Sequence, residues 1–329
     1  MSQHGFLSPT VAGLLAVAAA CGGDASSGGT EFAGTVRDSA GIQLVDNARD
    51  GLWPDDGGWT TEPLVTIGEA AGDPDYQFGQ IAAVDVLSDG RIVVLDQQAQ
   101  RIQVYGPDGT HVRSIGGPGN GPGELSPQAA GLFVGRGDTI VVPDMGNQRI
   151  MLVPPEGEPT SFPLRMEEGI PMGFDMSDAG ALVSQRRAMN FGDPTAEVAD
   201  VDVLLEQSYD GTITDTLLTP KRGGTFEMTA TGPRFELFAP EPQWTLLTGS
   251  RLAYASNDVY RISVYGPEGG LERIVSFPHE SQPVTEREQQ RIRELVRGIW
   301  EDNGVPPQAI EQMMGALSFA ETWPAFTRL

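Results

Sequence analysis

Short runs of alternating apolar and polar residues, separated by turns rich in Gly, Asp and Pro, fill most of this chain. Residues 91–113 contain two such runs, and they recur as residues 251–273 with nine identical positions, namely RIVVLDQQAQRIQVYGPDGTHVR and RLAYASNDVYRISVYGPEGGLER. Alternation with a period of two is typical of strands, and self-similarity at a fixed spacing indicates a repeat protein. The pattern therefore predicts a fold built from repeated β units.

Two further copies of this unit lie between the first two. Residues 137–157 repeat residues 89–109 at a shift of 48, and a weaker copy begins at Asp178 and resumes at residues 203–211. The equivalent positions that start the second run of each unit are Ile92, Ile140, Leu182 and Leu252. The sequence thus predicts four units.

Each unit reads as four short strands joined by turns, within roughly 40 to 50 residues, which is the size of a propeller blade. An all-β fold, a β-propeller of four-stranded antiparallel blades, is the favoured architecture. The alternative is a β-sandwich, but sandwiches do not repeat their turns in register. With 42 Gly and 25 Pro in 329 residues, the composition suits a body with many turns.

Helical periodicity occurs only near the C-terminus. Thr285 followed by Glu288 is a capping box that predicts a helix to about Glu301, and Pro306-Pro307 opens a second one. We expect a helical hairpin insertion at about 284–318. It can pack on one face of the propeller, or serve as a lid over the central channel or a docking surface.

The N-terminus predicts export. Ten small apolar residues, 11–20, precede Cys21, the only cysteine, and are too few to span a membrane. We interpret residues 1–20 as a signal peptide, 21–34 as a lipid-anchor tether with Cys21 acylated, and 35–329 as the propeller domain. The alternative is a secreted protein in which Cys21 is incidental, since Ala18 stands where a lipoprotein signal prefers Leu.

The net charge of the chain limits the classes of partner that we expect it to bind. The formal net charge of −24 argues against binding to nucleic acid or anionic membrane surfaces, which require basic contact faces. The basic pairs Arg186-Arg187 and Lys221-Arg222 are interpreted as solvated turns in polar loops. Membrane attachment is therefore expected only through the N-terminal lipid, and the expected partners are a protein, a peptide or a glycan.

Several segments carry a family resemblance. VRDSAGIQLVDN at 36–47, GQIAAVDVLSDGRIVVLD and IGGPGNGPGEL at 115–125 resemble the six-bladed β-propeller proteins related to NHL-repeat domains, common among bacterial envelope lipoproteins. The resemblance implies a binding scaffold in the outer membrane or periplasm, with only some relatives being enzymes. Proteins of this type usually continue after a segment such as FAETWPAFTRL, so we expect the last blade to be missing from this chain.

Candidate catalytic groups are few. Histidine occurs at His4, His111 and His279, which leaves little material for a histidine metal site or a Ser-His-Asp triad. The Gly-rich stretch 116–123 does not fit a dinucleotide-binding fingerprint and is interpreted as a loop between blades. The sequence therefore assigns no catalytic residue, no metal ligand and no cofactor.

Polar residues that recur before the third strand of each blade are the best candidates for ligand binding, namely Asp96, Asp144, Asn147, Asn257 and Asp258. The carboxylate and carbonyl oxygens of these residues could hold Ca²⁺, as in propeller lactonases of the gluconolactonase type. A Ca²⁺-dependent hydrolase or lyase is therefore the alternative function. The competing interpretation is structural, because Asp96 with Arg101 and Asp144 with Arg149 repeat the same spacing. The favoured function is an exported, lipid-anchored binding or scaffold protein.

Overall fold

The computed structural model describes residues 32–49, 60–129, 131–189, 199–229 and 232–329. The predicted signal peptide and Cys21 lie outside these residues. Within the described part of the chain, no helix is both long and apolar enough to cross a membrane.

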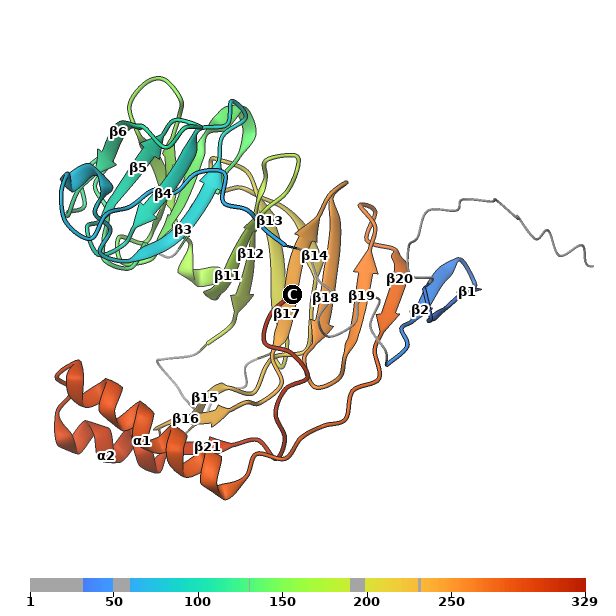
Figure 1. Ribbon diagram of the computed structural model, residues 1–329. Coiled ribbons are helices and arrows are strands. Elements are labelled where there is room, and N and C mark those ends of the chain that lie inside the picture. Colours follow the sequence, from blue (N-terminus) through green and yellow to red (C-terminus); the bar gives the residue numbers. More distant parts are fainter. Residues whose placement is uncertain (1–31, 50–59, 130, 190–198, 230–231) are drawn as a thin grey trace, which may run out of the picture.

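Four antiparallel blades, each built from four strands in chain order, make up most of the molecule (Figure 1). Three of them are separate four-stranded sheets, and the fourth belongs to a larger sheet. Blade 1 contains β3 (Ile81–Val86), β4 (Ile92–Asp96), β5 (Arg101–Tyr105) and β6 (His111–Gly116). Blade 2 contains β7 (Phe133–Val134), β8 (Ile140–Asp144), β9 (Arg149–Val153) and β10 (Thr160–Pro163). Blade 3 contains β11 (Ile170–Met176), β12 (Leu182–Arg187), β13 (Asp202–Gln207) and β14 (Ile213–Leu218). Blade 4 contains β17 (Pro242–Leu247), β18 (Arg251–Ser256), β19 (Arg261–Tyr265) and β20 (Leu271–Ser276).

These blades confirm the four predicted units. Ile92, Ile140 and Leu182 begin the second strands, and Leu252 is the second residue of β18. The turn glycine of the repeated Pro-Asp-Gly or Pro-Glu-Gly segment has a positive φ in each case, 83° at Gly109 and 76° at Gly269. A side chain with a Cβ is disfavoured in that conformation, so the recurring glycine is explained by the turn.

The blades succeed one another along an arc (Figure 1), and their first strands β3, β7, β11 and β17 contact one another in that order. The sheet of blade 4 is larger than predicted. The strands β1 (Thr35–Ser39) and β2 (Ile42–Asp46) form a hairpin, and β2 pairs in parallel with β20. The N-terminal strands therefore extend blade 4 to six strands.

A small α/β unit lies apart from the blades in Figure 1. It contains β15 (Phe226–Thr229), β16 (Gly232–Leu237), β21 (Leu317–Phe319), α1 (Glu286–Asp302) and α2 (Pro307–Gly315). The predicted capping box at Thr285 and Glu288 is present at the start of α1, so the helical hairpin is confirmed. Arg293 ties the hairpin to the small sheet, because its guanidinium donates to the carbonyl of Leu317 at 3.1 Å.

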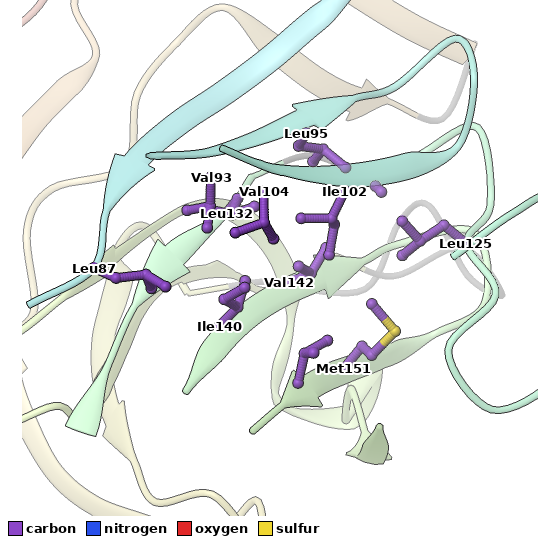
Figure 2. Packing of buried hydrophobic residues seen from close by; sticks show 12 residues of the cluster. Leu87, Val93, Leu95, Ile102, Val104, Leu125, Leu132, Ile140, Val142 and Met151 are labelled. Carbon is purple, nitrogen blue, oxygen red and sulfur yellow. The ribbon is translucent and has the colours of Figure 1, made fainter. Parts of the chain in front are cut away.

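Three short 3₁₀ turns lie where the chain enters or leaves strands, namely η1 (Pro74–Tyr76), η2 (Arg136–Asp138) and η3 (Met166–Glu168). The largest apolar cluster joins blades 1 and 2. Its buried members come from both sheets and from the connecting loop, and ten of them are labelled in Figure 2: Leu87, Val93, Leu95, Ile102, Val104, Leu125, Leu132, Ile140, Val142 and Met151. A second cluster, which includes Ile150, Phe162 and Leu182, joins blades 2 and 3.

Candidate functional site

The sequence-predicted residues lie at the ends of second strands or in the loops that follow them. Asp96 ends β4 and is fully buried. Its carboxylate accepts hydrogen bonds from the backbone N–H groups of Gly79 and Gln80, each at 3.1 Å, and of Ala99 at 3.2 Å. Asp96 therefore fixes both the loop that enters blade 1 and the turn that follows β4.

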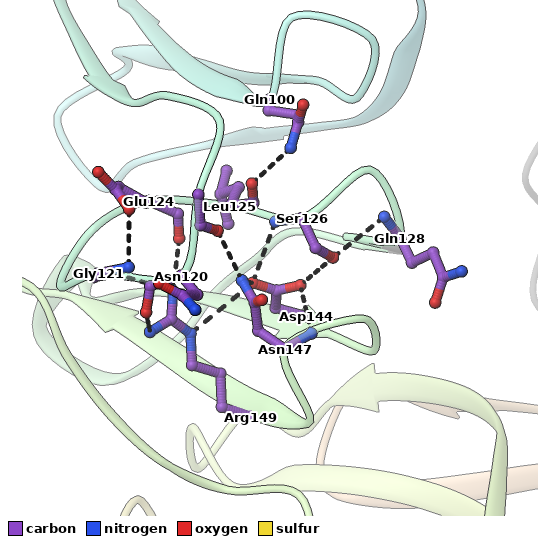
Figure 3. Close-up of polar contacts among 11 residues, drawn as sticks. Gln100, Asn120, Gly121, Glu124, Leu125, Ser126, Gln128, Asp144, Asn147 and Arg149 are labelled. Atoms are coloured by element: carbon purple, nitrogen blue, oxygen red, sulfur yellow. Dashed lines mark hydrogen bonds and ion pairs between the residues drawn. The ribbon is translucent and has the colours of Figure 1, made fainter.

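In blade 2, Asp144 likewise fixes the loop that enters the blade and the turn after the second strand (Figure 3). It is fully buried and accepts from the backbone N–H of Ser126 at 3.3 Å, from the Ser126 hydroxyl, and from Nδ2 of Asn147 at 2.7 Å. Asn147 also donates to the carbonyl of Gly119 at 2.9 Å. Asp144 and Asn147 are thus brought together as expected, with their polar atoms bound to the incoming loop.

The arginines that recur five residues later bind the carbonyl groups of the same loops. Arg101 donates to Pro74 and Gln77, both at 2.9 Å. Arg149 donates to Gly121 at 3.0 Å and Glu124 at 2.6 Å, and its Nε lies 3.7 Å from Asp144 Oδ2 (Figure 3). Aspartate binds the N–H groups of the entry loop and arginine binds its C=O groups, so the spacing has a structural explanation. Ligand binding by these residues stays a prediction.

The two predicted ligand-binding residues of blade 4 have different environments. Asn257 is buried, accepts from the N–H of Glu241 at 2.9 Å and donates to the carbonyl of Phe326 at 3.0 Å. Asp258 is exposed. Among the described residues, no group of three or more His, Cys, Asp or Glu side chains is arranged to hold a metal ion.

Blade 3 has no buried aspartate at the end of its second strand. The interpretation of Arg186-Arg187 as a solvated turn was wrong. Both residues end β12, and each is only 1% exposed. The repeat alignment contained the signal, because the shift that equates Ile92 with Leu182 places Arg186 on the buried Asp96. A position that is buried in two blades was a poor candidate for a solvated turn in the third.

Arg187 forms a buried ion pair in which the charges are exchanged between strands. In blades 1 and 2 the aspartate ends the second strand and the arginine begins the third, whereas here Arg187 ends β12 and Asp202 begins β13. Arg187 donates to Asp202 at 2.9 and 2.7 Å and to Glu241 at 2.9 Å. Burial opposes the charged guanidinium, but the hydrogen bonds to Asp202 and Glu241 outweigh it and raise the pKa of Arg187.

Among the residues that the structure describes, the hydrogen-bond partners of Arg186 are all neutral. Its guanidinium donates to the hydroxyl of Ser184 at 2.9 Å, the carbonyl of Arg165 at 3.3 Å and the amide oxygen of Gln207 at 3.4 Å. Burial lowers the pKa of Arg186, and the charge of Glu168 partly offsets this effect. Blade 3 therefore holds two buried cations where blades 1 and 2 hold a buried carboxylate.

A cavity of about 860 Å³ lies at the opposite ends of the strands, where the first strands of blades 1 to 3 turn into the second strands. Four carboxylates and one guanidinium line it, namely Asp85, Asp138, Asp175, Asp178 and Arg136. The sequence reasoning missed this site, although Asp85 and Asp175 occupy equivalent repeat positions, because the other charged residues of the lining lie in turns that differ between the blades.

The carboxylates of this cavity also link neighbouring blades. Asp85 of blade 1 accepts from the N–H of Val134 at 2.7 Å, and Asp175 of blade 3 accepts from the N–H of Leu246 at 2.9 Å. Asp138 of blade 2 accepts from the hydroxyl of Ser88 at 2.7 Å. The cavity is therefore surrounded by side chains in fixed positions.

Residues 73–152 match the family model DUF5128, described as a 6-bladed beta-propeller. The fold is a β-propeller, and these residues are similar to its six-bladed type. The matched residues contain blade 1 and most of blade 2. No curated protein matches the sequence.

Among solved structures, the propeller is similar to the Bacteroides fragilis protein BF0058, which is described as exported, with 14% identity and a TM-score of 0.43. The match covers 64% of this chain, and the chain spans 55% of that protein's length. Virginiamycin B lyase from Staphylococcus aureus gives 13% identity and a TM-score of 0.37, over 60% of this chain and 70% of the lyase.

Proposed function

We propose that this chain is an exported, lipid-anchored β-propeller of the bacterial envelope that binds a peptide or glycan in the cavity between blades 1, 2 and 3. The observation that carries the proposal is the cavity itself. Its volume of about 860 Å³ is in the range of ligand sites, and three blades contribute to its walls. A site shared by several blades is a recurrent way for a propeller to recognise a ligand that no single blade could enclose.

The lining favours a ligand with hydrogen-bond donors. Asp85, Asp138, Asp175 and Asp178 give four negative charges against the single positive charge of Arg136. An ionised carboxylate has about four acceptor positions. Asp178 accepts from the N–H of Gly249 at 2.6 Å, and Asp138 accepts from the N–H and the hydroxyl of Ser88. The remaining acceptor capacity fits ammonium, guanidinium or hydroxyl groups, as in basic peptides and amino sugars.

The binding test uses arrays of peptides and oligosaccharides probed with the labelled mature chain, followed by titration calorimetry on each hit. Asp178→Asn keeps an oxygen acceptor for Gly249 but removes the charge, so we expect cationic ligands to bind about tenfold more weakly. Asp210→Asn is the matched control, because Asp210 lies in another turn of blade 3 and is absent from the cavity lining.

Two results would contradict the binding site. One is a set of hits restricted to anionic ligands, and the other is equal affinity of a cationic hit for the Asp178→Asn variant and the unchanged chain. Raising the salt concentration should weaken binding of the cationic hits, because the attraction is electrostatic.

Export and anchoring rest on the apolar run 11–20 and on Cys21. We expect the chain to be found in the membrane fraction and to incorporate a labelled fatty acid, and the variant Cys21→Ser to lose both properties. Membrane association without acylation of Cys21 would contradict the anchor and leave the binding site untouched.

A further inference from the structure

Two side chains of β6 and one of the turn η1 meet in the order serine, histidine, aspartate. Nε2 of His111 lies 3.1 Å from the hydroxyl of Ser114, and Nδ1 of His111 lies 3.3 Å from Oδ2 of Asp75. We propose that this group is an acyl-transfer site in which Ser114 is the nucleophile, His111 is the general base and Asp75 orients the imidazole. The substrate class is an O-acyl ester.

A bulge in β6 makes the first contact. Residues three apart on a regular strand point to opposite faces. Here Val104 pairs with Arg113 and Tyr105 pairs with His111, so Val112 is an extra residue without a partner on β5. The bulge turns His111 onto the same face as Ser114, and bulges commonly re-aim side chains next to functional sites.

The second contact depends on the turn η1, which is fastened to the same face of blade 1. The carbonyl of Asp75 accepts from the hydroxyl of Tyr105 at 2.6 Å and from Nε2 of Gln103 at 3.3 Å. The hydroxyl of Tyr76 accepts from the backbone N–H of His111 at 2.9 Å. These contacts fix the backbone of the turn at Asp75, and from this position its carboxylate, 43% exposed, reaches Nδ1 of His111.

Aromatic rings enclose the imidazole. The rings of Tyr105 and Tyr76 lie edge-on to it, with centroids 5.6 and 6.5 Å away, and the His111 side chain is only 18% exposed. Ser114 is exposed. The base is thus shielded while the nucleophile faces solvent. Burial raises the pKa of Tyr105 to about 12, so Tyr105 stays neutral and does not compete with His111 as a base.

The reaction balances with water as the only co-substrate. The hydroxyl oxygen of Ser114 attacks the ester carbonyl while its proton moves to Nε2 of His111, and Asp75 stabilises the imidazolium through Nδ1–H. The ester C–O bond then breaks, and the leaving alkoxide takes the proton from Nε2. Water attacks the acyl-serine, gives a proton to His111 and releases the carboxylic acid, and the proton returns to Ser114.

The side chain of Gln103 sets one condition for this chemistry. Its amide oxygen accepts from the Ser114 hydroxyl. The proton must leave this contact and point to Nε2 of His111 before attack. The outer edge of β6 is not paired to another strand among the described residues, and we assign the oxyanion to backbone N–H groups along this edge.

Blade 2 supplies a matched control within the same molecule. Ser114 pairs with Gln103, and Ser161 pairs with Met151, the residue equivalent to Gln103 in the repeat. Ser161 is also exposed but has no histidine beside it in the structure. The two serines therefore differ chiefly in the His111–Asp75 pair.

The test treats the mature chain with a fluorophosphonate and measures modification of each serine by mass spectrometry. A general base accelerates such steps by about a hundredfold or more, so Ser114 should react that much faster than Ser161. His111→Gln should reduce the rate at Ser114 to that at Ser161. Asp75→Asn should lower it in part, and Asp75→Glu should restore most of it, which a purely structural role would not require.

Hydrolysis of p-nitrophenyl acetate gives the second readout, and we expect Ser114→Ala to abolish it while Ser161→Ala leaves it unchanged. Equal reaction of the two serines, or full esterase activity in the folded Ser114→Ala variant, would overturn the proposal. Urea unfolding of each variant separates lost chemistry from lost folding. The Asp178→Asn variant should keep full reactivity at Ser114, because the two sites do not share residues.

Discussion

Blades 1 and 2 are joined in a different way from blades 3 and 4, although the same repeat builds both pairs. Twelve buried apolar residues form the first interface (Figure 2). At the second, Nε1 of Trp244 donates to the amide oxygen of Gln185 at 2.8 Å, and Arg187 binds Glu241 across the blades. Gln185 is the repeat equivalent of Leu95, and Trp244 is the equivalent of Leu132. A pair of leucines in one interface is thus replaced by a hydrogen-bonded pair in the other.

A pocket adjoins the polar interface as well. A cavity of about 510 Å³ lies between blades 3 and 4, lined in part by Glu206, Leu246 and Tyr265. Apolar contacts contribute stability in proportion to buried area and have no preferred direction. A buried ion pair contributes less net stability but penalises any arrangement that separates its partners. The difference teaches that one repeat can fix neighbouring blades either by apolar burial or by charge and hydrogen-bond matching.

The largest effect is expected from breaking the buried ion pair. Asp202→Leu should lower the free energy of unfolding by about 3–5 kcal/mol, because it leaves two buried arginines with Glu241 as the only bound carboxylate. The double variant Arg187→Met, Asp202→Leu should recover much of the loss. Urea unfolding of the full chain measures the free energy of unfolding of both variants. If Asp202→Leu loses no more stability than the double variant, charge matching does not hold this interface.

A slightly smaller loss is expected at the apolar interface. Leu95 is fully buried in the cluster between blades 1 and 2, so Leu95→Ala should cost about 2–5 kcal/mol through lost burial and a residual cavity. Val36→Ala is the control, because Val36 is 55% exposed on β1 and its truncation should change stability by less than about 0.5 kcal/mol.

The equivalent position in blade 3 should respond through a hydrogen bond. Gln185→Leu leaves the indole N–H of Trp244 unpaired, which should cost about 1–3 kcal/mol. Adding Trp244→Phe removes the unpaired donor, so the double variant should lose less than the sum of the two single changes. Additive losses in a double-mutant cycle would contradict coupling between these residues.

The smallest effect concerns pH. Burial raises the pKa of Tyr105 from 10 to about 12, so the folded state keeps its proton where the unfolded state loses it. Stability should therefore be unaffected by this group below pH 10 and should decline between pH 10 and 12. Burial also raises the pKa of Tyr209 and Tyr254, so spectrophotometric titration should show a late-ionising group of tyrosines that is reduced by one in Tyr105→Phe. A variant with an unchanged titration curve would assign the late ionisation to another residue.

The sequence revealed the polar residues that recur in several blades, but not those that occur in a single blade or outside the repeat. Asp96 and Asp144 were identified because they recur at a shift of 48, and their structural explanation followed from the arginines five residues later. Arg186 and Arg187 were placed in a solvated turn because the sequence does not show that Asp202 begins the next strand beside them. Asp75 was not identified at all, since it lies 36 residues before His111 in a turn outside the repeat.

Local sequence patterns were enough to predict the four blades, the order of their strands and the two helices. These features depend on period-two alternation, turn glycines and a capping box, all of which act between residues close together in the chain. The packing of the assembled sheets decides that Arg187 faces Asp202 and Glu241, that a bulge turns His111 toward Ser114, and that three blades line one open pocket. The contact of Arg187 with Glu241 and the pocket join segments far apart in sequence, and the contact of His111 with Ser114 depends on how β6 pairs with β5. All of them form only when the sheets assemble and pack.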